Sequence, residues 1–238
     1  MTCLRRNPAA RVRLFCLPYA GGGASIFHSW PDKLSAACEV YAVHLPGREN
    51  RLTEPPFTKL SPLVQTLTEA LLPRLTTPFA FFGHSMGALI GFELARELRR
   101  QQAPSPTHLF VSGREAPQLP SREPPIHALP EPQFIAELQR FNGTPKEVLE
   151  YPELMQLLMP ALRADFAVCE TYTYTNDAPL DCPITAFGGL QDHRVSRERL
   201  EPWNDQSRAS FSLRMLPGDH FFLHKAEALL LKIIAQIL

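Results

Sequence analysis

The chain has 238 residues, of which 45% are hydrophobic and 20% charged, and its 24 basic and 24 acidic residues give a formal net charge of zero. This balance is typical of one globular domain and lacks the basic excess of proteins that bind nucleic acid. Five cysteines without the close spacing of a zinc or redox motif predict free thiols and no bound metal. Without a secretory signal or an apolar run of about 20 residues, the sequence predicts a cytoplasmic protein with no membrane association.

Apolar runs rich in β-formers alternate with helical patterns along the chain. Strands are predicted at 12–17, 40–45, 79–83, 108–112, 184–187 and 211–216, and helices at 25–34, 60–72, 86–99 and 225–238. Ser25 is expected to cap the first of these helices. Such alternation favours an α/β fold, in which helices cover both faces of a mainly parallel sheet.

The alternation stops between about residues 117 and 179. This stretch opens rich in proline and continues with short helical patterns at 132–140, 145–151, 152–159 and 160–171, without a clear strand. Helices inserted between two strands are typical of a lid, and long insertions of this kind are often functional. We therefore expect a single domain over 1–238 with a lid insertion at about 120–178, which a pair formed by Arg163 and Asp165 could brace.

One motif carries chemistry directly. Gly83-His84-Ser85-Met86-Gly87 matches G-x-S-x-G, and it follows the predicted strand at 79–83 and opens the predicted helix at 86–99. A strand, a sharp turn and a helix are the context of the nucleophile elbow in α/β-hydrolases. The alternative is a serine that merely caps the helix, but capping needs no glycine on both sides. Ser85 is the predicted nucleophile.

A serine nucleophile needs a base and an acid that orients the base. In this fold the chain order is serine, acid, histidine, with the last two on loops at the carboxyl ends of strands. Asp192 and His220 follow the last two predicted strands and fit those positions. Asp219 is a rival acid that is better placed to cap the last helix, and Asp165 is a second rival in the lid. The remaining histidines fit the base position less well: His28, His44, His84, His108, His127, His193 and His224.

The oxyanion of an acyl-transfer intermediate needs two N–H donors. One is expected from Met86, the residue after the nucleophile, and the other from the glycine-rich loop at 19–23 that follows the first predicted strand. The rival interpretation, a loop that cradles phosphate, lacks the accompanying Lys-Ser/Thr or G-x-G-x-x-G pattern.

Several segments in chain order match one family. They are LFCLPYAGGGAS at 14–25, Trp30, HLPGR at 44–48, Glu54-Pro55, PFAFFGHSMG at 78–87, FELA at 92–95, FNGTP at 141–145, LRADF at 162–166 and PGDHFF at 217–222. Through them the chain resembles the free-standing type II thioesterases of polyketide and non-ribosomal peptide synthesis, and also the medium-chain thioesterases of fatty acid synthesis.

The resemblance implies an α/β-hydrolase fold with a helical lid. Separately, we expect a monomer that needs no cofactor. The resemblance also implies hydrolysis of acyl thioesters on the phosphopantetheine arm of acyl or peptidyl carrier proteins, which removes wrong or stalled acyl groups. Carried over by position, the triad is Ser85, Asp192 and His220, and the oxyanion donors are the N–H groups of Ala20 and Met86. Tyr19 stands where many relatives have another aromatic residue or histidine, which leaves the acyl preference open.

Two groups of side chains have open roles. The first group could line an acyl pocket or simply pack the lid: Phe134, Phe141, Met155, Met159 and Phe166. The second could form a docking patch for an acidic carrier protein or be ordinary solvated arginines: Arg48, Arg51, Arg114 and Arg122. Rival functions are a small-molecule carboxylesterase or lipase, an acyltransferase or cyclase, and a protein that only binds acyl carriers.

Overall fold

A seven-stranded sheet with the strand order β1-β3-β2-β4-β5-β6-β7 forms the centre of the protein. The computed structural model describes residues 1–34, 37–141, 143 and 151–238. Only the edge pair of β1 and β3 is antiparallel, and every other pair is parallel. The strands are β1 (Thr2–Cys3), β2 (Val12–Leu17), β3 (Cys38–Ala42), β4 (Phe79–His84), β5 (His108–Ser112), β6 (Ile184–Gly189) and β7 (Phe211–Leu216). The predicted α/β architecture is confirmed.

Helices cover both faces of the sheet because the strands are apolar on both sides. Helices α2 (Leu60–Leu71) and α3 (Met86–Arg100) supply buried residues to the larger core cluster on one face. Helices α1 (Trp30–Lys33) and α9 (Glu227–Ile237) contribute to the cluster on the other face, together with α8 (Phe222–Lys225). The short α7 (Arg197–Leu200) packs against β6. Across the described part of the chain, no helix combines the length and the apolar character needed to cross a membrane.

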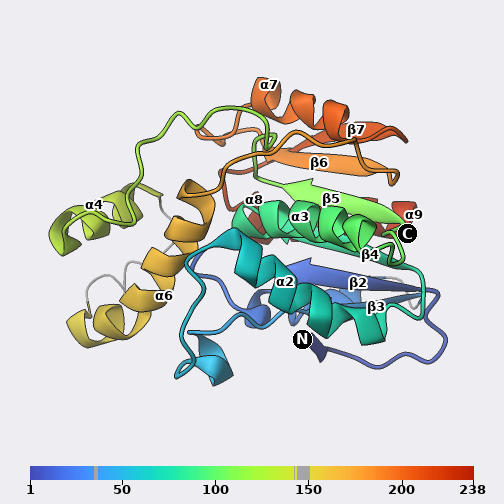
Figure 1. Ribbon diagram of the computed structural model, residues 1–238, viewed down its shortest axis with the longest axis horizontal. Coiled ribbons are helices and arrows are strands. Elements are labelled where there is room, and N and C mark those ends of the chain that lie inside the picture. The colour runs from blue at the N-terminus through green and yellow to red at the C-terminus, as the bar shows by residue number, and fades with distance from the viewer. Residues whose placement is uncertain (35–36, 142, 144–150) are drawn as a thin grey trace.

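Two helices lie beyond the edge of the sheet toward which the strand arrowheads point (Figure 1). They are α4 (Glu131–Phe141) and α6 (Pro152–Glu170), and they come between β5 and β6 in the chain. They share a small apolar cluster of their own, which contains Phe134, Met155 and Met159. The carboxyl ends of the parallel strands therefore face these two helices.

Some predicted elements differ from the structure. The patterns at 152–159 and 160–171 form one helix that continues through Pro160, and the pattern at 145–151 falls almost wholly outside the described residues. The helix expected from Ser25 to residue 34 is instead a 3-10 turn at Ala24–Phe27, preceded by Gly23, and then the one-turn α1. Ser25 is not the N-cap, because the 3-10 turn starts one residue earlier and Gly23 takes that position. The N–H groups of Ala24 and Ser25 in its first turn donate to the Glu49 carboxylate.

The smaller differences concern the bounds of two predicted elements and a few short elements that were not predicted. The strand expected at 40–45 is β3, which begins and ends earlier, at 38 and 42. The two-residue β1 and the helical turns at 197–206 carry no periodic signal and were not predicted. The closing helix is divided at Ala226 into α8 and α9.

A buried histidine gives the folded state a dependence on pH. His108 on β5 stacks on Phe110 with ring centroids 4.3 Å apart, and its Nε2 lies 2.8 Å from Thr185 Oγ1. Burial lowers the pKa of His108 from 6.5 to about 4. The unfolded chain therefore binds this proton at a higher pH than the folded chain, and the folded state loses stability as the pH falls from 6.5 toward 4.

We predict that His108→Gln removes this contribution. When the pH is lowered from 7 to 5, the unfolding free energy of wild type should fall by up to about 2 kcal/mol more than that of the variant. Urea unfolding of both proteins at the two pH values measures it. An unchanged difference would show that His108 is not held neutral by the fold.

Candidate active site

The turn between β4 and α3 holds Ser85 in an unusual backbone conformation. Ser85 has φ 52° and ψ −109°, lies one residue after the end of β4 and directly precedes α3. Its N–H donates to the Ser112 carbonyl at the end of β5, with an N···O distance of 2.7 Å. A non-glycine residue at positive φ costs roughly 1–3 kcal/mol and persists only where its surroundings impose it. Such strain is typical of functional sites.

Close backbone contacts on both sides of Ser85 impose this turn. A Cβ at Gly83 would lie 2.1 Å from the Gly87 carbonyl oxygen, and a Cβ at Gly87 would lie 2.1 Å from the Leu17 carbonyl oxygen. Both neighbours are main-chain atoms, which cannot move aside cheaply. The two glycines of the motif therefore let β2, β4 and α3 approach each other directly beneath Ser85.

A histidine and a buried carboxylate meet at the carboxyl ends of β6 and β7. His220 Nδ1 lies 2.8 Å from Asp192 Oδ2, and the Asp192 side chain is fully inaccessible to solvent. The other carboxylate oxygen accepts the N–H groups of Arg194 and Val195. Burial acts to raise the pKa of Asp192, but hydrogen bonds from His220 and from the two N–H groups outweigh it and leave that pKa below its usual value. Asp192 is thus an anion that orients one ring nitrogen of His220.

Ser85 and His220 lie on the same cavity of about 610 Å³. Tyr19 and Ala20 of the glycine-rich loop form part of its wall, and Asp192 lies behind His220. The Met86 side chain is buried in the core, while its N–H belongs to the first turn of α3, where N–H groups have no acceptor within the helix. The structure therefore brings four of the five predicted site residues to one place and puts the N–H of the fifth beside them.

The floor of the site is aromatic. His84 is fully buried, its Nδ1 lies 2.9 Å from Ser112 Oγ, and its ring centroid is 5.3 Å from that of His220. Burial, and to a smaller extent the neighbouring His220 and His224 rings, lowers the pKa of His84 well below the usual value, so this ring is neutral. Tyr19 packs edge-on against His84, and its hydroxyl lies 3.0 Å from His224 Nε2.

The residues with open roles divide between cavity and core. Phe141 and Phe166 line the cavity, together with Leu138 and Leu162. The other three predicted lid residues, Phe134, Met155 and Met159, are buried in the cluster that packs α4 against α6.

Two predicted arrangements of charged residues were wrong. Arg163 and Asp165 do not pair, because residues two apart on a helix point in different directions. Arg163 instead donates to the His127 carbonyl, and Asp165 binds Arg48. Arg48 is consequently 6% exposed and is not part of a surface patch.

The rival acid Asp219 does not pair with His220, as the sequence predicted. Its carboxylate instead accepts the Phe221 N–H and pairs with Lys225.

One wall of the cavity is a loop to which the sequence assigned no place in the substrate pocket. Residues 113–125 follow β5 and line the cavity along their length, and Arg114 is one of them. Arg194 also lines the cavity, with its guanidinium carbon 3.4 Å from the centroid of the Phe141 ring. The available signal was topological, since β5 ends at the same edge of the sheet as β4 and β6.

Comparison with known proteins places the chain among well-described relatives. The family model "Thioesterase domain" matches residues 12–237. The gramicidin S biosynthesis protein GrsT of Aneurinibacillus migulanus is 53% identical, with 93% of this chain and 86% of the relative covered. The medium-chain S-acyl fatty acid synthase thioesterase of Rattus norvegicus is 38% identical, with 95% and 87% covered. The solved structure of RedJ, a thioesterase of prodiginine biosynthesis in Streptomyces coelicolor, has a TM-score of 0.92 at 39% identity, with 98% of this chain and 92% of that chain covered.

The two glycines on α3 provide a test of the elbow geometry. Gly87→Ala places a Cβ in a steric clash with the Leu17 carbonyl. We therefore expect the unfolding free energy to fall by at least about 3 kcal/mol and thioester hydrolysis to be lost. Gly91→Ala, one turn later, meets only side-chain carbons and should change stability by less than about 1 kcal/mol. Chemical denaturation and thioester hydrolysis of both variants give the comparison, and equal effects would refute the steric argument.

Proposed function

The chain belongs to the thioesterase domain family, and from that premise we propose that it hydrolyses acyl thioesters held on the phosphopantetheine arm of carrier proteins, with Ser85 as the nucleophile. The main support is that the buried Asp192 carboxylate orients His220, and that His220 lines the same cavity as the strained Ser85. Serine is a weak nucleophile at its free pKa and needs such a base.

The first half of the proposed reaction forms an acyl-enzyme. Ser85 Oγ attacks the thioester carbonyl carbon while His220 Nε2 accepts the hydroxyl proton, and the carbonyl oxygen becomes an oxyanion. The N–H groups of Ala20 and Met86 are the proposed donors to that oxygen. Collapse of the intermediate breaks the C–S bond, and the departing pantetheine sulfur takes the proton from His220. Asp192 stabilises the imidazolium between these steps.

The second half returns the enzyme to its starting state. Water attacks the acyl-serine carbonyl and gives one proton to His220 Nε2, and the carbonyl oxygen again becomes an oxyanion. Cleavage of the ester C–O bond releases the carboxylic acid, and His220 returns its proton to Ser85 Oγ. No cofactor takes part in either half. The Ser85 hydroxyl makes no hydrogen bond to His220 here, and catalytic contacts of this kind commonly tighten only when substrate binds.

The cavity wall and the relatives support the choice of substrate. Leu138, Phe141, Leu162 and Phe166 offer apolar surface to an acyl chain, and the cavity volume suits a chain with part of the pantetheine arm. GrsT is named for gramicidin S biosynthesis and PikA5 of Streptomyces venezuelae is named a thioesterase. By this similarity the enzyme would serve a non-ribosomal peptide or polyketide pathway, removing aberrant or stalled acyl groups from its carriers.

Asp192 and the rival acid Asp219 allow a matched test of the triad. Asp192→Asn removes the acceptor that fixes the His220 tautomer, and we expect kcat to fall by about 10⁴-fold. Asp219→Asn, which changes a carboxylate bound to Phe221 N–H and Lys225, should stay within about threefold of wild type. Ser85→Ala should be inactive. Steady-state hydrolysis of an acyl-pantetheine thioester measures all three, and a larger effect at 219 than at 192 would overturn the assignment.

A substrate panel separates the proposed function from its rivals. We expect acyl groups loaded on a carrier protein to be hydrolysed with kcat/KM at least about tenfold above that of the free acyl-pantetheine and of the matching oxygen ester. The similarity to the medium-chain enzyme of Rattus norvegicus makes medium-chain fatty acyl carriers the second candidate. Preference for simple oxygen esters would instead identify a carboxylesterase, and transfer of the acyl group to an added alcohol or amine would identify an acyltransferase.

A further inference from the structure

A buried ion pair joins helix α6 to the loops at the edge of the sheet. Arg48 Nη1 donates to Asp165 Oδ2 at 2.6 Å, and Nη2 donates to Oδ1 at 2.8 Å, so each terminal guanidinium nitrogen binds one carboxylate oxygen. The two side chains are 7% and 4% exposed. Arg48 also donates to the carbonyl of Pro46. Paired and further hydrogen-bonded in this way, neither charge is left unsatisfied.

The same two side chains also hydrogen-bond to two peptide groups of the glycine-rich loop. The Gly21 N–H donates to Asp165 Oδ2 at 2.7 Å, and the Gly22 carbonyl accepts from Arg48 Nη1 at 3.1 Å. Asp165 lies on α6, while Arg48 lies on the segment after β3. The loop is therefore held between two elements that are 117 residues apart in the chain.

Helix α6 also packs closely against this loop at Gly21. Gly21 has φ +78°, and a Cβ there would lie 2.6 Å from Leu162 Cδ2, one turn before Asp165. The residue immediately before Gly21 is Ala20, which lines the cavity beside Ser85. Fixing the Gly21 peptide on one side leaves Ala20 little freedom to rotate its own N–H away from the cavity.

We propose that Asp165 is a positioning residue that aligns the Ala20 N–H with the reacting carbonyl, so that the oxyanion hole is complete only while α6 lies against the loop. This inference rests on the proposed function. It links the placement of the lid helix to catalytic competence, because the carboxylate that fixes the loop is carried by the lid. The contribution of Asp165 should be largest in the transition state, where the carbonyl oxygen carries its full charge.

Asp165→Asn tests the proposal. The asparagine side chain has the same size but only one acceptor oxygen. Its NH₂ group would face either Arg48 or the Gly21 N–H, so at least one contact that holds the loop is lost. We expect kcat per active site to fall by about 10–10²-fold with KM changed by less than about threefold, since one misaligned oxyanion donor costs up to about 10²–10³. Affinity for an acyl trifluoromethyl ketone, whose hemiketal carries the oxyanion, should fall by the same factor. Affinity for an S-alkyl pantetheine thioether, which has a CH₂ group in place of the carbonyl, should stay unchanged.

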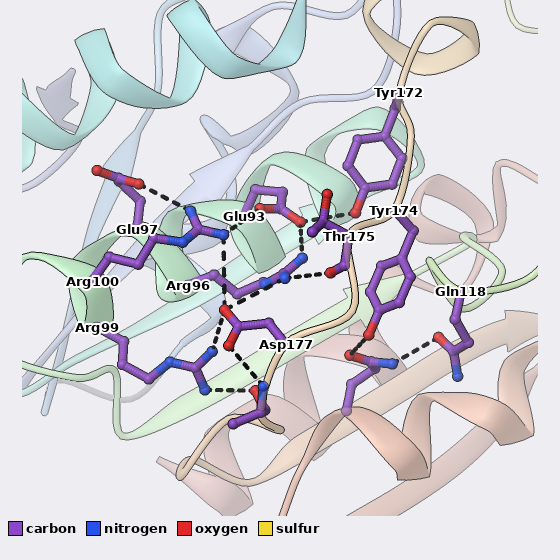
Figure 2. Close-up of polar contacts among 12 residues, drawn as sticks. Glu93, Arg96, Glu97, Arg99, Arg100, Gln118, Tyr172, Tyr174, Thr175 and Asp177 are labelled. Atoms are coloured by element: carbon purple, nitrogen blue, oxygen red, sulfur yellow. Dashed lines mark hydrogen bonds and ion pairs between the residues drawn. The ribbon is translucent and has the colours of Figure 1, made fainter.

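Another buried ion pair offers a matched control. Glu93 Oε1 on α3 accepts from Arg96 at 2.6 Å and from the Tyr172 hydroxyl at 2.8 Å, as Figure 2 shows. Glu93→Gln makes the same carboxylate-to-amide change at a pair that holds the segment after α6 but does not touch the glycine-rich loop. Its melting temperature should fall. Because Tyr172 lines the cavity, a shift of its ring would change both inhibitor affinities alike, and the ratio of ketone to thioether affinity should stay within about threefold of wild type.

Active-site titration with a fluorophosphonate corrects each rate for the fraction of folded enzyme. If Asp165→Asn does not fold, Arg48→Lys is used, because lysine keeps the charge and loses the second contact; a smaller loss in the same direction is expected. A variant with lowered stability but unchanged kcat and ketone affinity overturns the proposal and makes the pair a structural brace. Failure of the ketone to bind wild type, or activity in Ser85→Ala, would instead refute the proposed function.

Discussion

The backbone of Ser85 is the constraint on which the rest of the site depends. At φ 52° and ψ −109° it is unfavourable for a residue with a side chain, and it persists because the turn is held on several sides. The N–H of Ser85 is tied to the end of β5, and the glycines on either side admit contacts with β2 and α3 that no Cβ would allow. The parallel sheet supplies these anchors, since the strands on both sides of β4 end at the same edge. The packed core beneath, nearly all of it buried aromatic and aliphatic side chains, sustains the strain.

The same edge of the sheet gathers groups that are distant in sequence. His220 and Asp192 follow β7 and β6, and the glycine-rich loop follows β2, so each group is delivered by its own strand. Helices α4 and α6 close the space above and give the cavity its apolar wall. The nucleophile, base and acid therefore lie at rigid strand ends, whereas the wall of the substrate cavity comes from an insertion with an apolar cluster of its own. Asp165 on α6 joins the two parts, because its carboxylate holds the glycine-rich loop.

Sequence reasoning was strong wherever the signal was local. The strands at 12–17 and 108–112 were predicted with their observed bounds, because a buried parallel strand is a largely apolar run bounded by turns. The strand at 211–216, which is only partly buried at the edge of the sheet, was also predicted with its bounds, because apolar and polar residues alternate along it. The elbow followed from five adjacent residues together with the predicted strand before them and the predicted helix after them. Local rules failed where partners come from elsewhere. Ser25 suits a helix start, but the Glu49 carboxylate takes the N–H groups there. Pro160 suggests a helix end, yet the apolar stripe of Met155, Met159 and Leu162 holds α6 together through it.

The account's central claim is that the acyl group passes through a covalent bond to Ser85. Rapid mixing of the enzyme with acyl-loaded carrier protein, acid quenching within the first turnover and mass spectrometry of the digest test it most directly. The account predicts that the peptide containing residue 85 gains the mass of the acyl group minus one hydrogen, before free acid accumulates. Release of free acid while that peptide stays unmodified and another carries the acyl group would contradict the account.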